Sequence, residues 1–204
     1  MLKIWGHKGS SNVQKVLWCC GELGLEYALE EIGATDRLHK SPEYLAHNPN
    51  GLIPTIDDDG FVLWESNVIV RYLSAKHGMG TLCPADLVRR ADAERWMDWQ
   101  QTTLAAPMGV LFRALLKSPP EKTDPAQQDA AMQKAAACWT ILDSRLAAQP
   151  FVAGATLTMG DIALGNAVHR WFRLPVERPA LPHLAGWYAR LRDRPAYRQH
   201  IGWF

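Results

Sequence analysis

The sequence has no long hydrophobic run and no marked excess of charge of either sign. No apolar stretch approaches the roughly 20 residues that a membrane-spanning helix needs, and the first residues lack the apolar stretch of a secretory signal. Lysine and arginine number 22 against 21 acidic residues, which leaves a net charge of +1. This balance argues against general binding to nucleic acid or to an anionic membrane. We therefore expect a cytoplasmic protein with neither among its partners.

Cysteine is scarce, and its spacing excludes the common metal and redox motifs. The four cysteines are Cys19, Cys20, Cys83 and Cys138, and they form neither C-x-x-C nor a zinc-ligand pattern. The adjacent pair could form a disulfide only with strain. The seven histidines also lack metal-ligand spacing. We expect reduced, buried thiols and no metal cofactor.

The predicted secondary structure changes near residue 80, from mixed strands and helices to helices alone. With 204 residues, 48% of them hydrophobic, the chain can form one large domain or two small ones. The first part alternates short apolar runs with helical patterns. In order, the sequence predicts a strand at 2–6, a helix from 12 that Gly24 ends, a strand at 27–31, a short helix after Ser41, a hairpin at 54–64 and a helix capped at Ser66.

This order predicts an α/β domain followed by an all-α domain. Parallel strands joined by a helix, followed by a hairpin, give a four-stranded mixed sheet of the thioredoxin-like type. The rest shows only helical patterns, among them a long helix over 89–116 that Pro107 is expected to bend, and a capping box from Thr158 to Asp161. We expect domains at 1–78 and 87–204, joined by a linker at 79–86.

Ser10, Ser11 and Asn12 follow the first strand, where the chain enters the first helix. A helix N-terminus offers unpaired N–H groups and a partial positive charge, so hydroxyl and amide donors there could hold a thiolate or a phosphate. Serine and asparagine are also the preferred helix caps, and taken alone this triplet is a cap.

Three further segments each allow both a ligand-binding role and a purely structural one. Glu65 could bind an ammonium group and Ser66 a carboxylate. Alternatively, Ser66 is a plain helix cap and Glu65 an exposed acid. The step from Ile53 to Pro54 is compatible with a cis bond that leaves the backbone of Ile53 free to pair with an extended peptide, or with a trans proline on an edge strand. His39 and Lys40 could neutralise a second carboxylate, or they are solvated surface residues.

Taken together and in this order, the segments resemble the cytosolic glutathione transferase superfamily. The resemblance covers essentially the whole chain and is closest to the serine-type classes (phi, theta and zeta) and a bacterial branch of them. It rests on SSNVQKV (10–16), ELGLEY (22–27), HKSPE (39–43), NPNGLIP (48–54), WESNVIVRYL (64–73) and TMGDIA (158–163).

The resemblance implies a role for each candidate residue. Glu65 and Ser66 would hold the γ-glutamyl end of glutathione, and the backbone of Ile53 would pair with the cysteinyl unit beside Pro54. His39 and Lys40 would lie near the glycyl carboxylate. The sulfur would accept a hydrogen bond from Ser10 in the phi-like pattern, from Ser11 in the theta-like spacing, or from Asn12. Leu52 departs from the glutamine that phi-type proteins often carry.

The resemblance also implies an activity, an acceptor pocket and a homodimer. The activity is conjugation of the glutathione thiolate to a small electrophile, with glutathione as co-substrate. The alternatives are glutathione-dependent disulfide or peroxide reduction and non-catalytic ligand binding. The family's geometry places the electrophile beside His7, Lys8, Met108, Leu111, Phe112 and Arg113, with Trp171 a further candidate.

Overall fold

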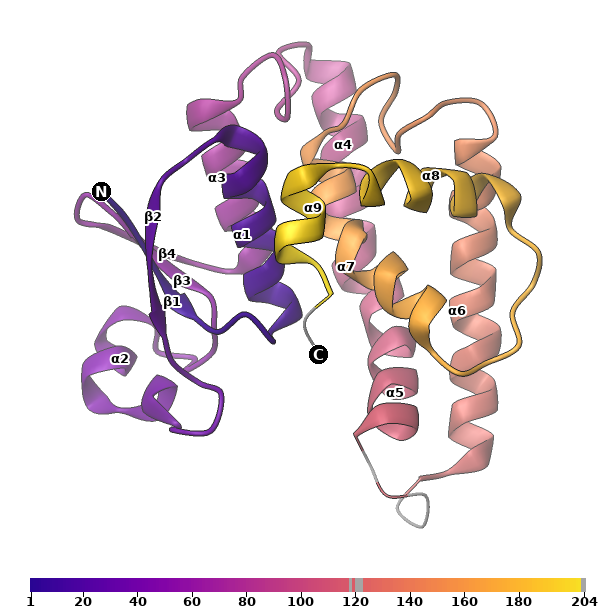
Figure 1. Cartoon of the computed structure of the whole chain (residues 1–204), viewed down its shortest axis with the longest axis horizontal. Helices are drawn as coiled ribbons and strands as arrows, with labels where there is room; N and C mark the ends of the chain where they lie inside the picture. Colours follow the sequence, from indigo (N-terminus) through magenta and orange to yellow (C-terminus); the bar gives the residue numbers. More distant parts are fainter. Residues whose placement is uncertain (118, 120–122, 203–204) are drawn as a thin grey trace. The chain divides into compact units, whose positions relative to one another are not determined.

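The structure is a computed structural model that describes residues 1–117, 119 and 123–202 (Figure 1). Its contacts divide the chain into two compact units. The first unit holds Met1–Ala85 together with the residues from Arg194 onward, and the second holds Asp86–Asp193.

The first unit is built on a mixed four-stranded sheet. Its strands lie in the order β2-β1-β3-β4, with β1 parallel to β2 and antiparallel to β3, and β3 antiparallel to β4. This confirms the thioredoxin-like prediction. In chain order the elements are β1 (Leu2–Gly6), α1 (Ser11–Leu23), β2 (Tyr27–Glu31), η1 (Leu38–Lys40), α2 (Pro42–His47), β3 (Thr55–Asp58), β4 (Phe61–Trp64) and α3 (Ser66–His77).

The helices cover the two faces of this sheet unequally. Figure 1 shows α1 and α3 side by side on one face and α2 on the other. Successive side chains of a strand point to opposite faces. Ile4 is accordingly fully buried in the main core, whereas its neighbour Trp5 packs with Ile32 and Tyr44 beneath α2.

The C-terminal helix α9 (Pro195–His200) belongs to the first unit. Its Tyr197 ring meets Trp18 of α1 edge to face at 4.8 Å, and Arg194 donates two hydrogen bonds, of 2.7 and 2.5 Å, to the Glu22 carboxylate. The expected helical domain of 87–204 differs from the observed division here, because the apolar face of α9 packs on α1.

Among its described residues, the second unit has helices and no strand longer than an isolated bridge between Phe151 and Gly154, in line with the predicted all-helical domain. The helices are α4 (Leu87–Trp99), η2 (Gln100–Leu104), α5 (Ala105–Leu116), α6 (Pro125–Leu146), α7 (Met159–Arg173) and α8 (Pro182–Arg192). The expected long helix over 89–116 is interrupted by the π-helical turn η2, which ends three residues before Pro107, while the bend expected at Pro107 stays a prediction.

A second sequence prediction also needs correction, since Ser66 does not cap α3. The N-cap position is occupied by Glu65, and Ser66 is the first residue of the helix. By contrast, the predicted capping box of α7 is present. The fully buried Asp161 carboxylate accepts hydrogen bonds from the Thr158 N–H (2.8 Å), the Val152 N–H (3.0 Å) and the Trp187 indole (2.9 Å).

We expect Asp161→Ala to lower the free energy of unfolding by about 3 kcal/mol or more, because it leaves several buried donors without an acceptor. Guanidinium unfolding followed by circular dichroism measures this. The control is Asp124→Ala, which removes an exposed cap of α6 and should cost much less. Equal losses for the two variants would contradict the role assigned to Asp161.

Candidate functional site

The loop before α1 brings Ser10, Ser11 and Asn12 to the start of that helix. Ser10 is the N-cap, its N–H donates to the His7 carbonyl at 3.0 Å, and its side chain makes no capping hydrogen bond. The buried Gln14 side chain holds the same loop by donating to the Lys8 carbonyl at 2.7 Å. Ser10 and Ser11 are half-buried and Asn12 is exposed.

The loop from α2 to β3 is fixed by its own polar side chains. The Ile53–Pro54 peptide bond is cis. The Leu52 carbonyl accepts hydrogen bonds from the Tyr44 hydroxyl (2.6 Å) and the Asn48 amide (2.8 Å). Within the described residues, the Ile53 N–H and C=O have no hydrogen-bond partner. An extended peptide could therefore pair with this backbone, as it would with the edge of a sheet.

Glu65 and Ser66 stand where β4 ends and α3 begins. The Glu65 backbone has φ +73° and ψ +106°, a conformation that side chains rarely adopt. Its carbonyl accepts the Ile69 N–H at 2.9 Å, so the residue is tied into the first turn of α3 while its side chain stays exposed. The nearly buried Ser66 lies at the positive end of the helix dipole.

These three segments line one pocket. Asn12, Ile53, Pro54, Glu65 and Ser66 lie around it, together with Asn48, Asn50 and Leu52. Residues from the first turn of α1 and from the start of α3 both contribute to its wall, so the pocket combines two helix N-termini with the exposed Glu65 carboxylate and the free backbone edge of Ile53. Ser10 and Ser11 are not among the lining residues.

His39 and Lys40 lie next to this pocket in η1. The Lys40 ammonium donates to the Asn50 carbonyl at 3.3 Å, and Gly51, with φ +56°, leaves no room for a side chain against it. The His39 Nδ1 is buried without a hydrogen-bond partner. Lys40 thus reaches the rim of the pocket, and His39 packs against Gly33.

The residues expected to line an electrophile pocket are divided between the two units. In the first unit, His7 is half-buried and Lys8 is exposed. In the second, Met108 and Leu111 are buried, Phe112 lies 3.8 Å beneath the Arg170 guanidinium, and Arg113 is exposed. Trp171 is fully buried. Their role as a pocket lining stays a prediction.

The protein's own thiols are unsuited to chemistry. All four cysteines are free and buried, as predicted. Burial raises the pKa of Cys19 to about 12 and that of Cys20 further. Because the thiolate is the reactive form, neither thiol is a nucleophile near neutral pH.

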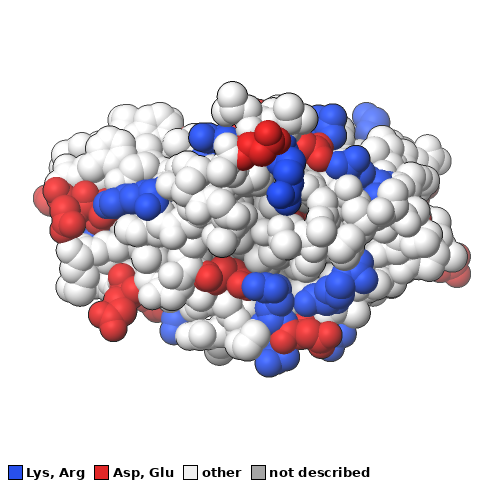
Figure 2. Space-filling model, turned by 90° about the horizontal axis from the view of Figure 1, so that it is seen from above, with Lys and Arg blue, Asp and Glu red and all other residues white. Residues whose placement is uncertain are grey.

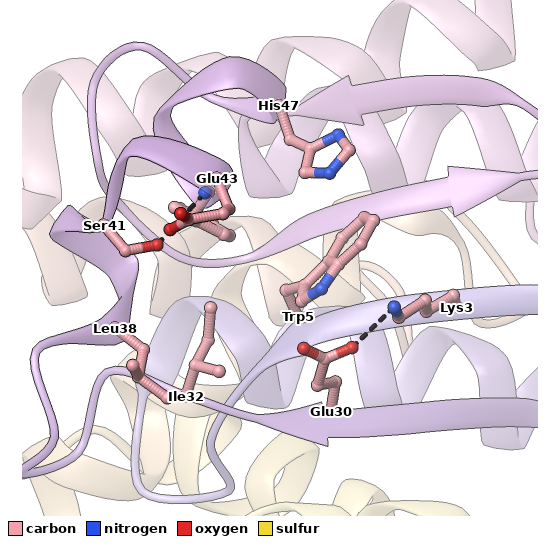
Figure 3. A pocket seen from close by; sticks show the side chains of 9 residues that line it. Lys3, Trp5, Glu30, Ile32, Leu38, Ser41, Glu43 and His47 are labelled. Carbon is pink, nitrogen blue, oxygen red and sulfur yellow. Dashed lines mark hydrogen bonds and ion pairs between the residues drawn. The ribbon is translucent and has the colours of Figure 1, made fainter.

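A second hollow of ≈ 240 Å³ lies between the sheet and α2 (Figure 3). No sequence pattern indicates it. Its acids are already engaged: Glu30 pairs with Lys3 at 2.5 Å, and Glu43 accepts hydrogen bonds from its own N–H and from the Ser41 hydroxyl, which lower the pKa of its carboxyl. Trp5 is stacked on His47 at 4.7 Å and lies under the Lys3 ammonium at 4.5 Å. No charge is left over to select a ligand.

Neither the charges on the face shown nor the metal-ligating side chains of the described residues indicate a further site. On the face shown in Figure 2, the Lys and Arg side chains are interspersed with Asp and Glu, and neither sign dominates. Among the residues that the structure describes, no cluster of three His, Cys, Asp or Glu side chains could hold a metal ion. Within the same residues, no helix combines the length and the apolarity that crossing a membrane requires.

Comparison with known proteins gives the pocket its context. The family model for the glutathione S-transferase N-terminal domain matches residues 9–76, and that for the C-terminal domain matches residues 125–190. Glutathione S-transferase GstB of Escherichia coli (strain K12) is 38% identical over 203 residues, covering 98% of both chains. Glutathione S-transferase 3 of Zea mays is 31% identical over 217 residues, covering 98% of this chain and 93% of its own.

A solved structure agrees with these relatives. The theta class glutathione S-transferase of Xanthomonas axonopodis pv. citri, crystallised with glutathione bound, superposes with a TM-score of 0.93 at 44% identity, covering 98% of this chain and 96% of its own. The fold and these relatives define the class of protein, in which a thioredoxin-like domain is followed by a helical one. The chain belongs to the glutathione S-transferase family.

The structure adds pocket residues that the sequence did not single out. Asn48 and Asn50 stand in an Asn-Pro-Asn-Gly stretch that the sequence interprets only as a turn, and Leu52 is noted only for the glutamine it replaces. The signal that could have found them is the density of side-chain amides immediately before a predicted cis proline. Two amides in such a turn can fix the loop through hydrogen bonds to its backbone.

We expect Glu65→Gln to weaken glutathione binding by about 30-fold or more, because it removes the carboxylate that faces a bound ammonium group. Isothermal titration calorimetry with glutathione measures the change. The control is Glu31→Gln, a neutralised acid at the exposed end of β2. Unchanged affinity in Glu65→Gln would remove Glu65 from the site.

We also expect a thiol reagent to leave the folded protein active. At pH 8 the four buried thiols should react with a disulfide reagent over hours, and in guanidinium within seconds, because unfolding exposes them and restores their ordinary pKa. The released chromophore and the residual activity are followed together. Rapid inactivation with one thiol titrated would show that a protein cysteine takes part.

Proposed function

We propose that this glutathione S-transferase binds glutathione in the pocket of the first unit and transfers its thiolate to a small electrophilic carbon. The observation that carries the proposal is the meeting, in one pocket, of Asn12, the Ile53–Pro54 loop, Glu65 and Ser66, which come from three separate parts of the chain. The ligand has an amino-acid end, a thiol and a second carboxylate, and each has a counterpart in or beside this pocket.

The counterparts are specific in charge and in direction. The exposed Glu65 carboxylate pairs with the γ-glutamyl ammonium, and Ser66 with the first N–H groups of α3 receives its carboxylate. The unpaired N–H and C=O of Ile53 bind the cysteinyl unit in the manner of an added strand. Lys40, with His39 beside it, attracts the glycyl carboxylate at the rim.

Among the three candidates for the sulfur contact, the pocket favours Asn12. Its side chain lines the pocket, whereas Ser10 and Ser11 do not. A thiol has a pKa of about 8.5, and lowering it by about two units requires about 2.7 kcal/mol of preferential thiolate stabilisation. A hydrogen bond to a charged group, about 1.5–3 kcal/mol, plus a helix N-terminus, about 0.3–1 kcal/mol, supplies this. No protein base is needed.

The proposal extends to the electrophile site, the oligomeric state and the cellular role. A small electrophile would contact His7, Lys8, Met108, Leu111, Phe112 and Arg113. A homodimer is favoured by the exposure of apolar side chains close to the pocket, namely Leu52 at 59%, Val68 at 41% and Trp64 at 38%. Detoxification in the cytoplasm is the role that fits such chemistry. Light scattering at several concentrations tests the dimer.

We expect Asn12→Ala to raise the pKa of the bound glutathione thiol by about one to two units and to lower kcat/KM by 10- to 100-fold, since each unit corresponds to about 1.4 kcal/mol. Ultraviolet titration of the glutathione complex and steady-state conjugation of a chlorodinitrobenzene measure the two effects. Ser10→Ala and Ser11→Ala are the matched comparisons and should change the pKa less.

A larger effect in Ser10→Ala or Ser11→Ala would transfer the role to that serine. A thiol that ionises in the wild-type complex as it does in buffer would contradict thiolate activation altogether. The same preparations are assayed for reduction of a hydroxyethyl disulfide by glutathione. Turnover of the disulfide without conjugation of any halogenated substrate would favour the reductase alternative.

A further inference from the structure

The hollow between the sheet and α2 is large enough to hold a small ligand. Its volume of ≈ 240 Å³ exceeds the roughly 150 Å³ of an engineered protein cavity that binds one benzene ring. Well-packed protein interiors contain few voids larger than a water molecule. The hollow therefore offers space for a flat molecule of about two fused rings, which is a use that the glutathione pocket does not cover.

The walls of this hollow provide aromatic and aliphatic surface. Trp5, Ile32 and Tyr44 are buried and form a cluster of their own, in which the rings of Trp5 and Tyr44 meet edge to face at 6.5 Å. Leu38 of η1 also lines the hollow and is 51% exposed (Figure 3). A ligand in the hollow would remove part of this apolar surface from water.

The charged groups of the hollow favour a neutral ligand, because they interact with one another or with the protein. Lys3 pairs with Glu30, and Glu43 accepts hydrogen bonds from its own N–H and from Ser41. A charged ligand would have to break these contacts or lose hydration without a partner. A neutral aromatic ring instead gains favourable edge or stacking contacts with the ring of Trp5.

Two residues connect the hollow with the glutathione pocket. Tyr44 lines the hollow, and its hydroxyl donates to the Leu52 carbonyl at 2.6 Å. The Ile53 side chain packs against the cluster that contains Tyr44, and Leu52 and Ile53 both line the glutathione pocket. Leu38 in turn begins η1, the element that carries Lys40. A molecule in the hollow would therefore contact the residues that support the cis-proline loop.

We propose that this hollow is a second ligand site, which binds a neutral, planar aromatic molecule of about two fused rings and, when occupied, tightens the binding of glutathione. The added contacts stabilise the cluster under α2, and with it the loop arrangement in which Ile53 can pair with glutathione. The coupling is reciprocal, so glutathione tightens binding in the hollow by the same factor. The second site is independent of the proposed function, whereas the coupling rests on it.

The site is tested by titrating the nitrogen-15-labelled protein with 2-naphthol, a two-ring probe that is neutral at pH 7. We expect saturable shifts of the Trp5 indole and Ile32 amide resonances, with a dissociation constant of about 1 mM or less. Leu38→Ser should weaken binding by about threefold or more, because it removes apolar surface from the wall. The matched control is Leu45→Ser, since Leu45 is an exposed leucine of α2 that does not line the hollow. Absence of saturable shifts at Trp5 and Ile32, or equal losses in the two variants, would overturn the site.

The coupling is tested by calorimetric titration with glutathione, with and without saturating 2-naphthol. We expect affinity for glutathione to rise about fivefold when the probe is present. Tyr44→Phe keeps the ring but removes the hydroxyl that donates to Leu52, so this variant should bind 2-naphthol and lose the gain. Equal glutathione affinities in the wild type, or a gain that persists in Tyr44→Phe, would overturn the coupling. A wild type that does not bind glutathione would instead reject the proposed function, and the 2-naphthol titration would still decide whether the hollow is a site.

Discussion

The site depends on one arrangement, in which two helices begin at the wall of a single pocket. Asn12 in the first turn of α1 and Glu65 and Ser66 at the start of α3 line it together, and the N-terminus of each helix carries a partial positive charge. A ligand that carries negative charge at two separated points suits such a volume. In the proposed function, the free backbone edge of Ile53 would fix the ligand's direction, and Glu65 would fix which end lies at α3.

Most of this arrangement can be read from the sequence, because the signals are local. The helical spacing from Val13 to Leu23, the hairpin around Asp57–Gly60 and the serine and proline at the start of α2 each act over a few residues. The order of the elements then leaves few topologies, and the mixed sheet follows. Glu65, Ser66 and Pro54 are likewise marked by short sequence patterns, and the structure places all three in the lining of one pocket.

What the sequence missed depends on the direction of single side chains, on local backbone geometry and on contacts between distant segments. The choice among Ser10, Ser11 and Asn12 is a matter of which way three neighbouring side chains face, and periodicity does not resolve single residues at a helix start. The π-helical turn at Gln100–Leu104 has no marker in the sequence, because the signal that a helix changes there, Pro107, lies three residues beyond it. The packing of α9 on α1 joins residues some 170 positions apart, as the pair of Glu22 and Arg194 shows.

That last contact has a consequence for how the protein is made. Helix α1 contributes Asn12 to the pocket lining, and on α1 pack Tyr197, against Trp18, and Arg194, which donates to Glu22. During synthesis the ribosome delivers the sheet and its helices first, and the last partner of α1 emerges after the whole second unit. Until then, the Trp18 ring and the Glu22 carboxylate of α1 lack the contacts with α9 that the folded unit contains.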